Sequence, residues 1–272
     1  MRSHHMTIEI SAHFTFELDG PTDILLQYEA ADIPEQSVLW TDSRIDKSDY
    51  FARVAAQDEI GTRIWLRKEG HCEVDYKARI AIHRLTADLS ALPAMQQHEL
   101  PGETVQYLFD SRYCPAERFH SFVQEEFGTI EGGAKIVAMR DWVADHMSYE
   151  PGSSHSNTTA LDSFVERRGI CRDYAHVIVT MARAAGIPAR YVSVYAPDVA
   201  PPDFHAIAEV FLADPDGSGR GTWHMVDGTF MADPEHTVKI GVGRDAADVS
   251  FLTSFGACDF REKTVRTEIV SD

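Results

Sequence analysis

Short segments in which hydrophobic and polar residues alternate recur along the first part of the chain. They lie at residues 7–10, 14–18, 24–28, 63–66 and 74–80. A period of two is typical of strands that bury one face, so these segments predict a series of antiparallel strands. Asp19-Gly20-Pro21 predicts a turn, and Lys68-Glu69-Gly70-His71 predicts a hairpin connection. We therefore expect a β-sandwich-like N-terminal domain over residues 7–112, with residues 91–104 as a linker.

After residue 112 the hydrophobic spacing changes to three and four residues, which predicts helices. Two amphipathic helices are indicated by apolar residues at Phe119, Phe122, Val123 and Phe127, and then at Ile136, Met139, Val143 and Met147. Pro115 suits a first helical turn. Thr159, with Asp162 three residues later, predicts a capping box for a third helix that would end at Gly169.

A fourth helix is predicted to begin at Cys171, because a wide apolar stripe follows it as far as Gly186-Ile187-Pro188. Strands are predicted again at residues 190–195, 204–212, 222–226 and 264–270. Residues 214–219 contain Asp, Pro and Gly and predict a hairpin loop between the middle two of these strands. The order of strands, helices and strands indicates an α+β protein, and residues 113–272 would form a core of helices packed on an antiparallel sheet.

The composition is that of a globular protein, with 44% hydrophobic residues and a formal net charge of −18. No basic run is present, so neither a nucleic-acid partner nor an anionic membrane surface is expected. No stretch of 18 apolar residues occurs, which predicts that no helix crosses a membrane. The sequence contains no clustered ligand set such as His-Glu-x-x-His, so we expect no metal and no other cofactor.

The four cysteines, Cys72, Cys114, Cys171 and Cys258, form no Cys-x-x-Cys pair, which argues against a zinc ribbon or a redox dithiol. No apolar secretory segment opens the chain, and we set residues 1–5 aside from the reasoning about the fold. The thiols are therefore expected to be free, in a reducing and cytoplasmic compartment. Cys72 and Cys258 are expected to be structural, and no histidine context accompanies Cys114.

Cys171 lies where a helix is predicted to begin. The thiolate is the nucleophilic form of cysteine, and the unpaired N–H groups and the dipole of a helix N-terminus stabilise it. The same N–H groups can donate hydrogen bonds to the oxyanion of a tetrahedral intermediate. Cys171 is therefore a candidate nucleophile. The alternative is an ordinary core thiol on an apolar helix, because cysteine is among the most buried residue types.

His205 and Asp227 lie on or just after two strands that the predicted hairpin connects. Pairing Leu212 with Thr222 across its loop places His205 and Asp227 on one face as diagonal neighbours. A carboxylate beside an imidazole fixes its tautomer and stabilises the imidazolium that forms when it takes a thiol proton. The predicted triad is Cys171 as nucleophile, His205 as base and acid, and Asp227 as orienting group. The alternative is a partly buried histidine that bonds to any nearby acid, with Asp227 serving only in a turn.

Three blocks carry these residues, and they read Gly-Ile-Cys171-Arg-Asp-Tyr-Ala-His, Asp-Phe-His205-Ala and Trp-His-Met-Val-Asp227-Gly-Thr. They resemble the catalytic blocks of the bacterial transglutaminase-like superfamily of cysteine enzymes, which includes cysteine proteases. The blocks that begin Arg112-Tyr-Cys-Pro, Gly186-Ile-Pro-Ala-Arg-Tyr and Gly243-Arg-Asp-Ala-Ala-Asp-Val are similar to the same bacterial branch, whose members carry an N-terminal β domain.

The resemblance implies a papain-like α+β core with a Cys-His-Asp triad in that chain order. Two positions depart from the pattern of the superfamily. Ile207 stands where members commonly carry an aromatic residue, which implies a reshaped acyl pocket. Gly228 follows Asp227 where proline or alanine is frequent. Neither departure changes a residue of the predicted triad.

Four further residues are predicted to bind substrate. Tyr149, His155 and Asn157 lie on the loop before the catalytic helices, and Asp173 lies in the first turn of the Cys171 helix. For Asp173 the alternative is that an acid simply suits the positive end of the helix dipole. For His155 the alternative is an isolated, satisfied loop histidine.

Two functional hypotheses from different classes follow. In the first, the chain is an enzyme in which Cys171 attacks a glutamine side-chain amide or a peptide bond of a protein or peptide substrate. The resulting thioester is resolved by an amine or by water, and the choice depends on the shape of the cleft and on water exclusion. In the second, the chain is a non-catalytic binding or scaffold module that retains the fold, and the intact triad counts against it.

Overall fold

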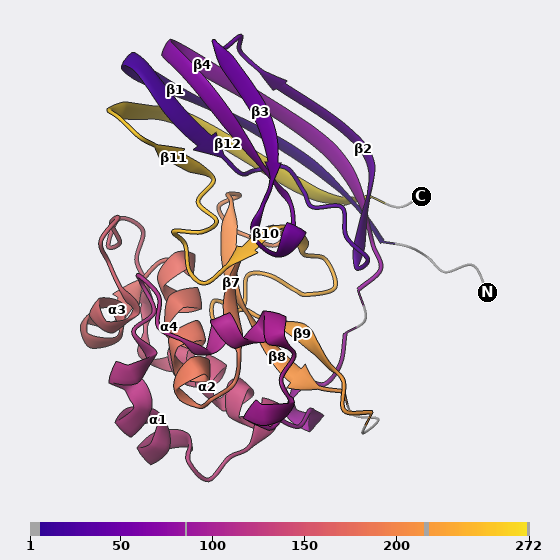
Figure 1. Ribbon diagram of the computed structural model, residues 1–272, viewed down its shortest axis with the longest axis vertical. Coiled ribbons are helices and arrows are strands. Elements are labelled where there is room, and N and C mark those ends of the chain that lie inside the picture. Colours follow the sequence, from indigo (N-terminus) through magenta and orange to yellow (C-terminus); the bar gives the residue numbers. More distant parts are fainter. Residues whose placement is uncertain (1–5, 85, 215–217, 271–272) are drawn as a thin grey trace, which may run out of the picture.

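A long curved sheet and a helical core with its own sheet make up the chain (Figure 1). The structure is a computed structural model that describes residues 6–84, 86–214 and 218–270. In the view of Figure 1 the curved sheet lies at the top and the helices α1–α4 lie at the bottom. The strands of the core sheet, β7–β10, lie beside the helices, with β10 nearest to the curved sheet. The predicted α+β class, with antiparallel sheets, is confirmed.

Two long antiparallel strands, β1 and β4, form the middle of the upper sheet. β2 and β3 pair with opposite ends of β4, and β11 and β12 pair with β1. The strands of this sheet are β1 Met6–Leu26, β2 Gln36–Ile45, β3 Tyr50–Ala55, β4 Thr62–Ile82, β11 Leu252–Ser254 and β12 Cys258–Val270. An antiparallel N-terminal unit is therefore present, but its strands join one sheet and do not form a sandwich of two.

The two turns predicted within these strands are wrong. β1 continues through Asp19-Gly20-Pro21, and β4 continues through Lys68-Glu69-Gly70-His71. The register between the two strands shifts between Leu18 and Thr22, and Gly70, opposite Leu18, adopts a φ of +69°. Glycine and proline here produce an irregularity within a pair of long strands and do not reverse the chain.

The last strand of the described chain belongs to the upper sheet. β12 runs antiparallel to β1, with Thr7 opposite Val270 and Leu18 opposite Cys258. The assignment of residues 113–272 to the core is therefore corrected for β11 and β12. Alternation predicts that a segment is a strand, but it does not specify which sheet edge the strand joins.

The α-helices of the core lie where the apolar spacing predicts them, and their bounds are α1 His120–Phe127, α2 Gly132–His146, α3 Ala160–Glu166 and α4 Cys171–Ala184. The predicted capping box of α3 is present, since Thr159 N donates to Asp162 Oδ2 at 2.8 Å and Asp162 N donates to Thr159 Oγ1 at 3.3 Å. α3 ends before the predicted Gly169, because Arg167 adopts a left-handed φ of +58°. The 3-10 helices are η1 Gln57–Glu59, η2 Leu89–Ala91, η3 Gln97–Glu99, η4 Gly102–Leu108 and η5 Ala116–Phe119.

The segment predicted as a linker, residues 91–104, packs against the core. Leu92 and Met95 are buried. The start of α2 approaches the preceding 3-10 helix closely, because a Cβ on Gly133 would lie 1.8 Å from the carbonyl oxygen of Leu89. Only glycine fits at that contact.

The sheet of the core is antiparallel, with the order β10-β7-β8-β9. Its strands are β7 Ala189–Tyr195, β8 His205–Ala213, β9 Gly221–Val226 and β10 Val238–Gly243. The predicted pairing of Leu212 with Thr222 is confirmed, whereas β10 was not predicted. The predicted hairpin loop 214–219 includes residues 215–217, which lie outside the described residues. A short parallel pair, β5 Ser148–Tyr149 and β6 Arg168–Gly169, precedes α4, which packs on β8.

A buried carboxylate connects three strands of the core sheet. Glu209 of β8 has no solvent exposure, and it accepts hydrogen bonds from Arg190 of β7 at 2.7 Å and from Lys239 of β10 at 2.6 Å. Burial alone would raise the pKa of Glu209, but the two cations outweigh burial and lower it to about 2. Lys239 also bonds to Glu35, and Arg190 bonds to Asp58 at 3.1 Å. The network therefore holds the N-terminal region against the core sheet.

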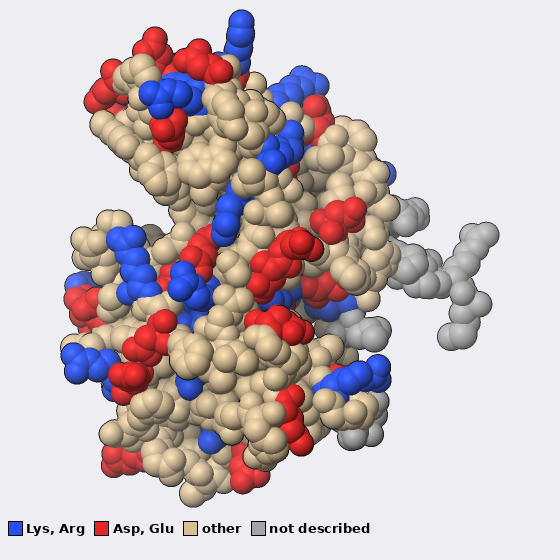
Figure 2. Space-filling model, viewed as in Figure 1, with Lys and Arg blue, Asp and Glu red and all other residues tan. Residues whose placement is uncertain are grey.

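The molecular surface carries both signs of charge. On the face shown in Figure 2, Lys and Arg are interspersed with Asp and Glu. One exposed pair is Arg67 with Asp23, at 2.8 Å, and both side chains are about half exposed. Such pairs contribute about 0–1 kcal/mol to stability.

We expect Glu209→Ala to lower the free energy of unfolding by about 3–5 kcal/mol, because it leaves two buried cations without their shared carboxylate. Asp23→Ala is the matched control, since it removes an exposed carboxylate and should cost no more than about 1 kcal/mol. Urea unfolding at pH 7 measures both changes. Equal effects of the two substitutions would contradict a structural role for the buried network.

Candidate active site

Cys171 is the first residue of α4, and its side chain is partly exposed. Asp173 fixes the start of the helix, because its Oδ2 accepts a hydrogen bond from Ile170 N at 2.9 Å. The β5–β6 pair places Tyr149 opposite Gly169, two residues before the thiol. A Cβ on Gly169 would lie 2.6 Å from the Cβ of Asp173, so the segment requires glycine there. These local contacts hold the thiol at the positive end of α4.

His205 is the first residue of β8, and its imidazole is buried. Its Nε2 donates a hydrogen bond to Asp227 Oδ2 at 3.0 Å. Its Nδ1 has no nitrogen or oxygen partner among the described residues. Burial lowers the pKa of His205, but hydrogen bonding with Asp227 and interaction with the thiol of Cys171 outweigh burial and raise it to about 10. The imidazole therefore keeps its second proton at neutral pH, and Nδ1 is the nitrogen that is not bonded to Asp227.

Asp227 is held by a turn that follows β9. Its Oδ1 accepts from Thr229 N at 2.8 Å, and its Oδ2 accepts from Met231 N at 3.0 Å and from Ala232 N at 2.8 Å. Burial opposes ionisation of this carboxyl, but the hydrogen bonds from His205 and Thr229 outweigh burial and lower its pKa. An ionised, fixed carboxylate keeps the proton of the imidazole on Nε2 and directs the lone pair of Nδ1 elsewhere.

Cys171 and His205 line one cleft with a volume of about 670 Å³. Tyr149 of β5 lines the same cleft. Residues 249–253 and Lys263 of β12 also contribute, so segments that follow the core in the chain take part in the site. A nucleophile at a helix start, an oriented imidazole and a shared cleft are the arrangement that acyl chemistry requires.

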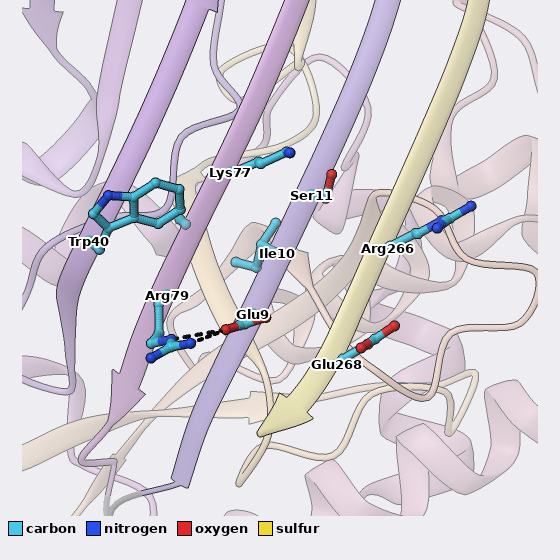
Figure 3. Close-up of a pocket in the computed structure, with 9 residues that line it drawn as sticks. Glu9, Ile10, Ser11, Trp40, Lys77, Arg79, Arg266 and Glu268 are labelled. Carbon is cyan, nitrogen blue, oxygen red and sulfur yellow. Dashed lines mark hydrogen bonds and ion pairs between the residues drawn. The ribbon is translucent and has the colours of Figure 1, made fainter. Parts of the chain in front are cut away.

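A second hollow, of about 440 Å³, lies on the upper sheet (Figure 3). Its side chains come from β1, β2, β4 and β12, and they include Trp40 and the ion pair of Arg79 with Glu9. The residues that line this hollow include no cysteine and no histidine. It therefore has neither a nucleophile nor a base of the kind present at Cys171.

Of the four residues predicted to bind substrate, only Tyr149 lines the cleft among the described residues. Tyr149 lines the cleft, and burial together with the charge of Cys171 raises the pKa of its hydroxyl to about 12. His155 and Asn157 do not line the cleft, since His155 lines a separate small pocket. Pro151, Gly152 and Ser156 of the same loop do line the cleft, whereas Asn157 N bonds to the His155 ring at 3.3 Å.

Asp173 also does not line the cleft. Its carboxylate is fully buried and bonds to Ile170 N, to Ser154 Oγ at 2.9 Å and to Arg172 at 3.2 Å. Burial raises its pKa, and these three hydrogen bonds oppose the shift. The substrate-binding prediction for Asp173 is therefore corrected in favour of its alternative, an acid that stabilises the start of α4.

Other residues that line the cleft were not predicted as site residues. Arg112 and Tyr113 precede the helices, and Tyr191 comes from β7. Arg112 and Tyr113 belong to a block that resembles the superfamily, but that block indicated no role for them. Residues 249–253 carried no signal, because their position depends on the return of β11 and β12 to the upper sheet.

The remaining thiols lie in environments that disfavour ionisation. Burial raises the pKa of Cys72 to about 12 and that of Cys114 to about 11, and it also raises the pKa of Cys258. The thiol of Cys114 donates to the carbonyl oxygen of His176 at 3.7 Å. These contacts agree with structural roles for the three thiols.

One group of potential metal ligands occurs among the described residues. His13, Glu73 and Asp75 come within 4.8 Å of one another, and their side chains are partly or largely exposed on β1 and β4. The imidazole of His13 already bonds to Asp75, its direct cross-strand neighbour, at 3.0 Å. This is an ordinary cross-strand pair. In the described part of the chain, none of the helices combines the length and the apolar character that crossing a membrane demands.

Comparison with known proteins gives matches over the core and over the whole chain. Residues 121–228 match the model of the transglutaminase-like superfamily. A crystal structure from Cytophaga hutchinsonii, described as a "putative cysteine protease", is 28% identical, with a TM-score of 0.89 over 99% of this chain and 92% of that one.

Two uncharacterized mycobacterial proteins are also similar. One from Mycobacterium leprae is 30% identical over 43% of this chain, and one from Mycobacterium bovis is 34% identical over 38% of it. The matched segments span 42% and 35% of the length of those proteins, so less than half of each is covered.

We expect iodoacetamide at pH 7.5 to modify Cys171 first. The raised pKa values of Cys72 and Cys114 leave them with thiolate fractions roughly a thousandfold and a hundredfold, respectively, below that of an ordinary thiol. Peptide mapping by mass spectrometry over time identifies the modified residue. Early labelling at any other cysteine, or an unchanged labelling rate in Cys171→Ala, would contradict the assignment of the reactive thiol.

The stability that His205 contributes should depend on pH. Its pKa is raised from the ordinary value of 6.5 to about 10, so the folded chain holds a proton that the unfolded chain releases. The contribution is complete below pH 6.5 and is lost as the pH rises to about 10. We expect the difference in free energy of unfolding between the wild type and His205→Gln to shrink over that range in urea titrations. A difference that is constant or grows would contradict a protonated, paired imidazole.

Proposed function

Because residues 121–228 match the model of the transglutaminase-like superfamily, we propose that this chain is a cysteine-dependent enzyme that acts on amides. Cys171 is the nucleophile, His205 is the base and acid, and Asp227 orients the imidazole. One observation carries the proposal. His205 bonds to Asp227 through Nε2, its Nδ1 has no nitrogen or oxygen partner among the described residues, and His205 lines the same cleft as Cys171.

The first half of the reaction forms a thioester. The raised pKa of His205 favours a state in which the thiol proton already lies on Nδ1, and the thiolate sulfur attacks the carbonyl carbon of the amide. Negative charge develops on the carbonyl oxygen, and the N–H groups at the start of α4 are the donors available to stabilise it. When the intermediate collapses, Nδ1 returns its proton to the departing amine and the C–N bond breaks.

The second half releases the acyl group. Water or an amine gives a proton to Nδ1 and attacks the thioester, and Cys171 leaves as the thiolate. Cys171 is partly exposed in a surface cleft, which supports water as the acceptor. We therefore propose hydrolysis of a peptide bond or of a glutamine side-chain amide, in a protein or peptide substrate. The "putative cysteine protease" of similar fold supports the same class of reaction.

Casein tests the proposal, because it offers both peptide bonds and glutamine side chains. We expect wild-type protein to release new α-amines or ammonia, Cys171→Ala to release neither, and His205→Ala to be about 10²- to 10⁴-fold slower. Monodansylcadaverine incorporation measures transfer to an amine in the same samples. An exposed variant outside the cleft, Arg118→Ala, serves as the control.

The outcomes separate the enzyme from the non-catalytic module. Activity that persists in Cys171→Ala would remove the nucleophile from the proposal. No release and no transfer by the wild type, together with no preferential alkylation of Cys171, would favour a binding or scaffold module.

A further inference from the structure

Arg112 is an exposed cation that lines the cleft of Cys171 and His205. Its Cζ lies 5.0 Å from the centre of the Tyr113 ring. Among the described residues, no carboxylate and no carbonyl oxygen accepts a hydrogen bond from this guanidinium. A contact with the face of a ring leaves the N–H donors of arginine available.

The other cations of the cleft are already paired within the protein. Arg172 donates to Ser154 Oγ and to Thr158 O, each at 3.1 Å, and it lies 3.2 Å from Asp173. Its Cζ also lies 4.4 Å from the centre of the Tyr113 ring. Arg172 therefore supports the loop before α4 and has few donors left for a ligand.

Lys263 is paired with the carboxylate that lines the cleft. Its Nζ donates to Asp203 Oδ2 at 2.6 Å, and Asp203 Oδ1 accepts from Phe204 N at 2.7 Å. Asp203 is the sole carboxylate among the described residues that line the cleft, and it is neutralised by Lys263. No acidic residue of the cleft is thus free to pair with Arg112.

The cleft consequently differs in charge from the rest of the protein. The chain as a whole carries a formal charge of −18, whereas the described lining contains three cations and one carboxylate. An excess of positive charge in the lining raises the local concentration of anionic ligands. A planar guanidinium with free donors matches a carboxylate through two parallel hydrogen bonds.

We infer that Arg112 is a specificity-determining residue that binds a carboxylate of the substrate close to the attacked amide. The substrate class is therefore a peptide with a carboxylate close to the attacked amide, either an acidic side chain or a free C-terminus. The inference rests on the proposed function, because it assigns a substrate to the same cleft. Arg112 acts on binding and takes no part in the transfer of protons.

Two alkylating probes of similar size test the inference without knowledge of the natural substrate. Iodoacetate carries a carboxylate and iodoacetamide carries a neutral amide, and both react with Cys171. We expect Arg112→Ala to slow the reaction with iodoacetate by about fivefold and to leave the reaction with iodoacetamide unchanged. Arg112→Lys should retain part of the iodoacetate rate, and 0.5 M salt should reduce the difference between the wild type and Arg112→Ala. Arg118→Ala, an exposed arginine outside the cleft, is the matched control.

The ratio of the two rates separates this inference from the proposed function. The wild type and Arg112→Ala both contain His205. A difference between them in the ratio of the iodoacetate rate to the iodoacetamide rate therefore reports on Arg112. If iodoacetamide labels Cys171 but the ratio is the same in the wild type and Arg112→Ala, the inference is wrong and the proposed function stands. If neither probe labels Cys171 preferentially, the proposed function itself fails.

Two peptides then identify the source of the carboxylate. One contains glutamate and has a blocked C-terminus, and the other contains glutamine in its place and has a free C-terminus. The peptide that slows alkylation of Cys171 by iodoacetamide in the wild type, but not in Arg112→Ala, carries the recognised group. The inference would be overturned if the peptides slowed alkylation of Cys171 equally in the wild type and in Arg112→Ala, or if neither peptide slowed it.

Discussion

The buried carboxylate of Glu209 is the constraint on which the geometry of the core sheet depends. A carboxylate without solvent must be met by cations, and these are Arg190 of β7, the strand beside β8, and Lys239 of β10, the strand beyond β7. β8 begins with His205, so the pairing that fixes this strand also fixes the imidazole. Two further carboxylates, from the N-terminal region, bond to the same cations. The upper sheet and the core are thereby held in one arrangement around the cleft.

Asp227, which follows β9, is likewise a carboxylate whose position is fixed by the groups that bond to it. Its carboxylate accepts hydrogen bonds from three backbone N–H groups of the turn that it begins, and this turn orients it toward His205. Because the carboxylate is already fixed by the backbone, the imidazole gains a rigid partner at no further cost in side-chain freedom. The turn after β9 and the orientation of the His205 ring thus depend on a single side chain.

The sequence predicts those parts of the site that local patterns determine. The hairpin spacing predicts the pairing of Leu212 with Thr222, and that pairing brings His205 and Asp227 within hydrogen-bonding distance. Two kinds of feature could not be predicted. The sheet edge that β12 joins depends on contacts across the whole chain, and turn propensity at residues 19–21 is overridden because the residues before and after them pair with β4. His155 and Asp173 were predicted to bind substrate because they are close in sequence to Cys171. Neither lines the cleft, because each bonds to residues near it in the chain.

The pairing of β12 with β1 has a consequence for the order in which the molecule is assembled. In the chain, the whole helical core stands between these two strands, so β1 has an open edge until the 13 residues of β12 have been synthesised. An unpaired edge invites contact with other chains, and the core can fold while that edge is open. Lys263 of the cleft arrives with the same strand. Cys171, His205 and Asp227 can therefore come together on a growing chain before the lining of their cleft is complete.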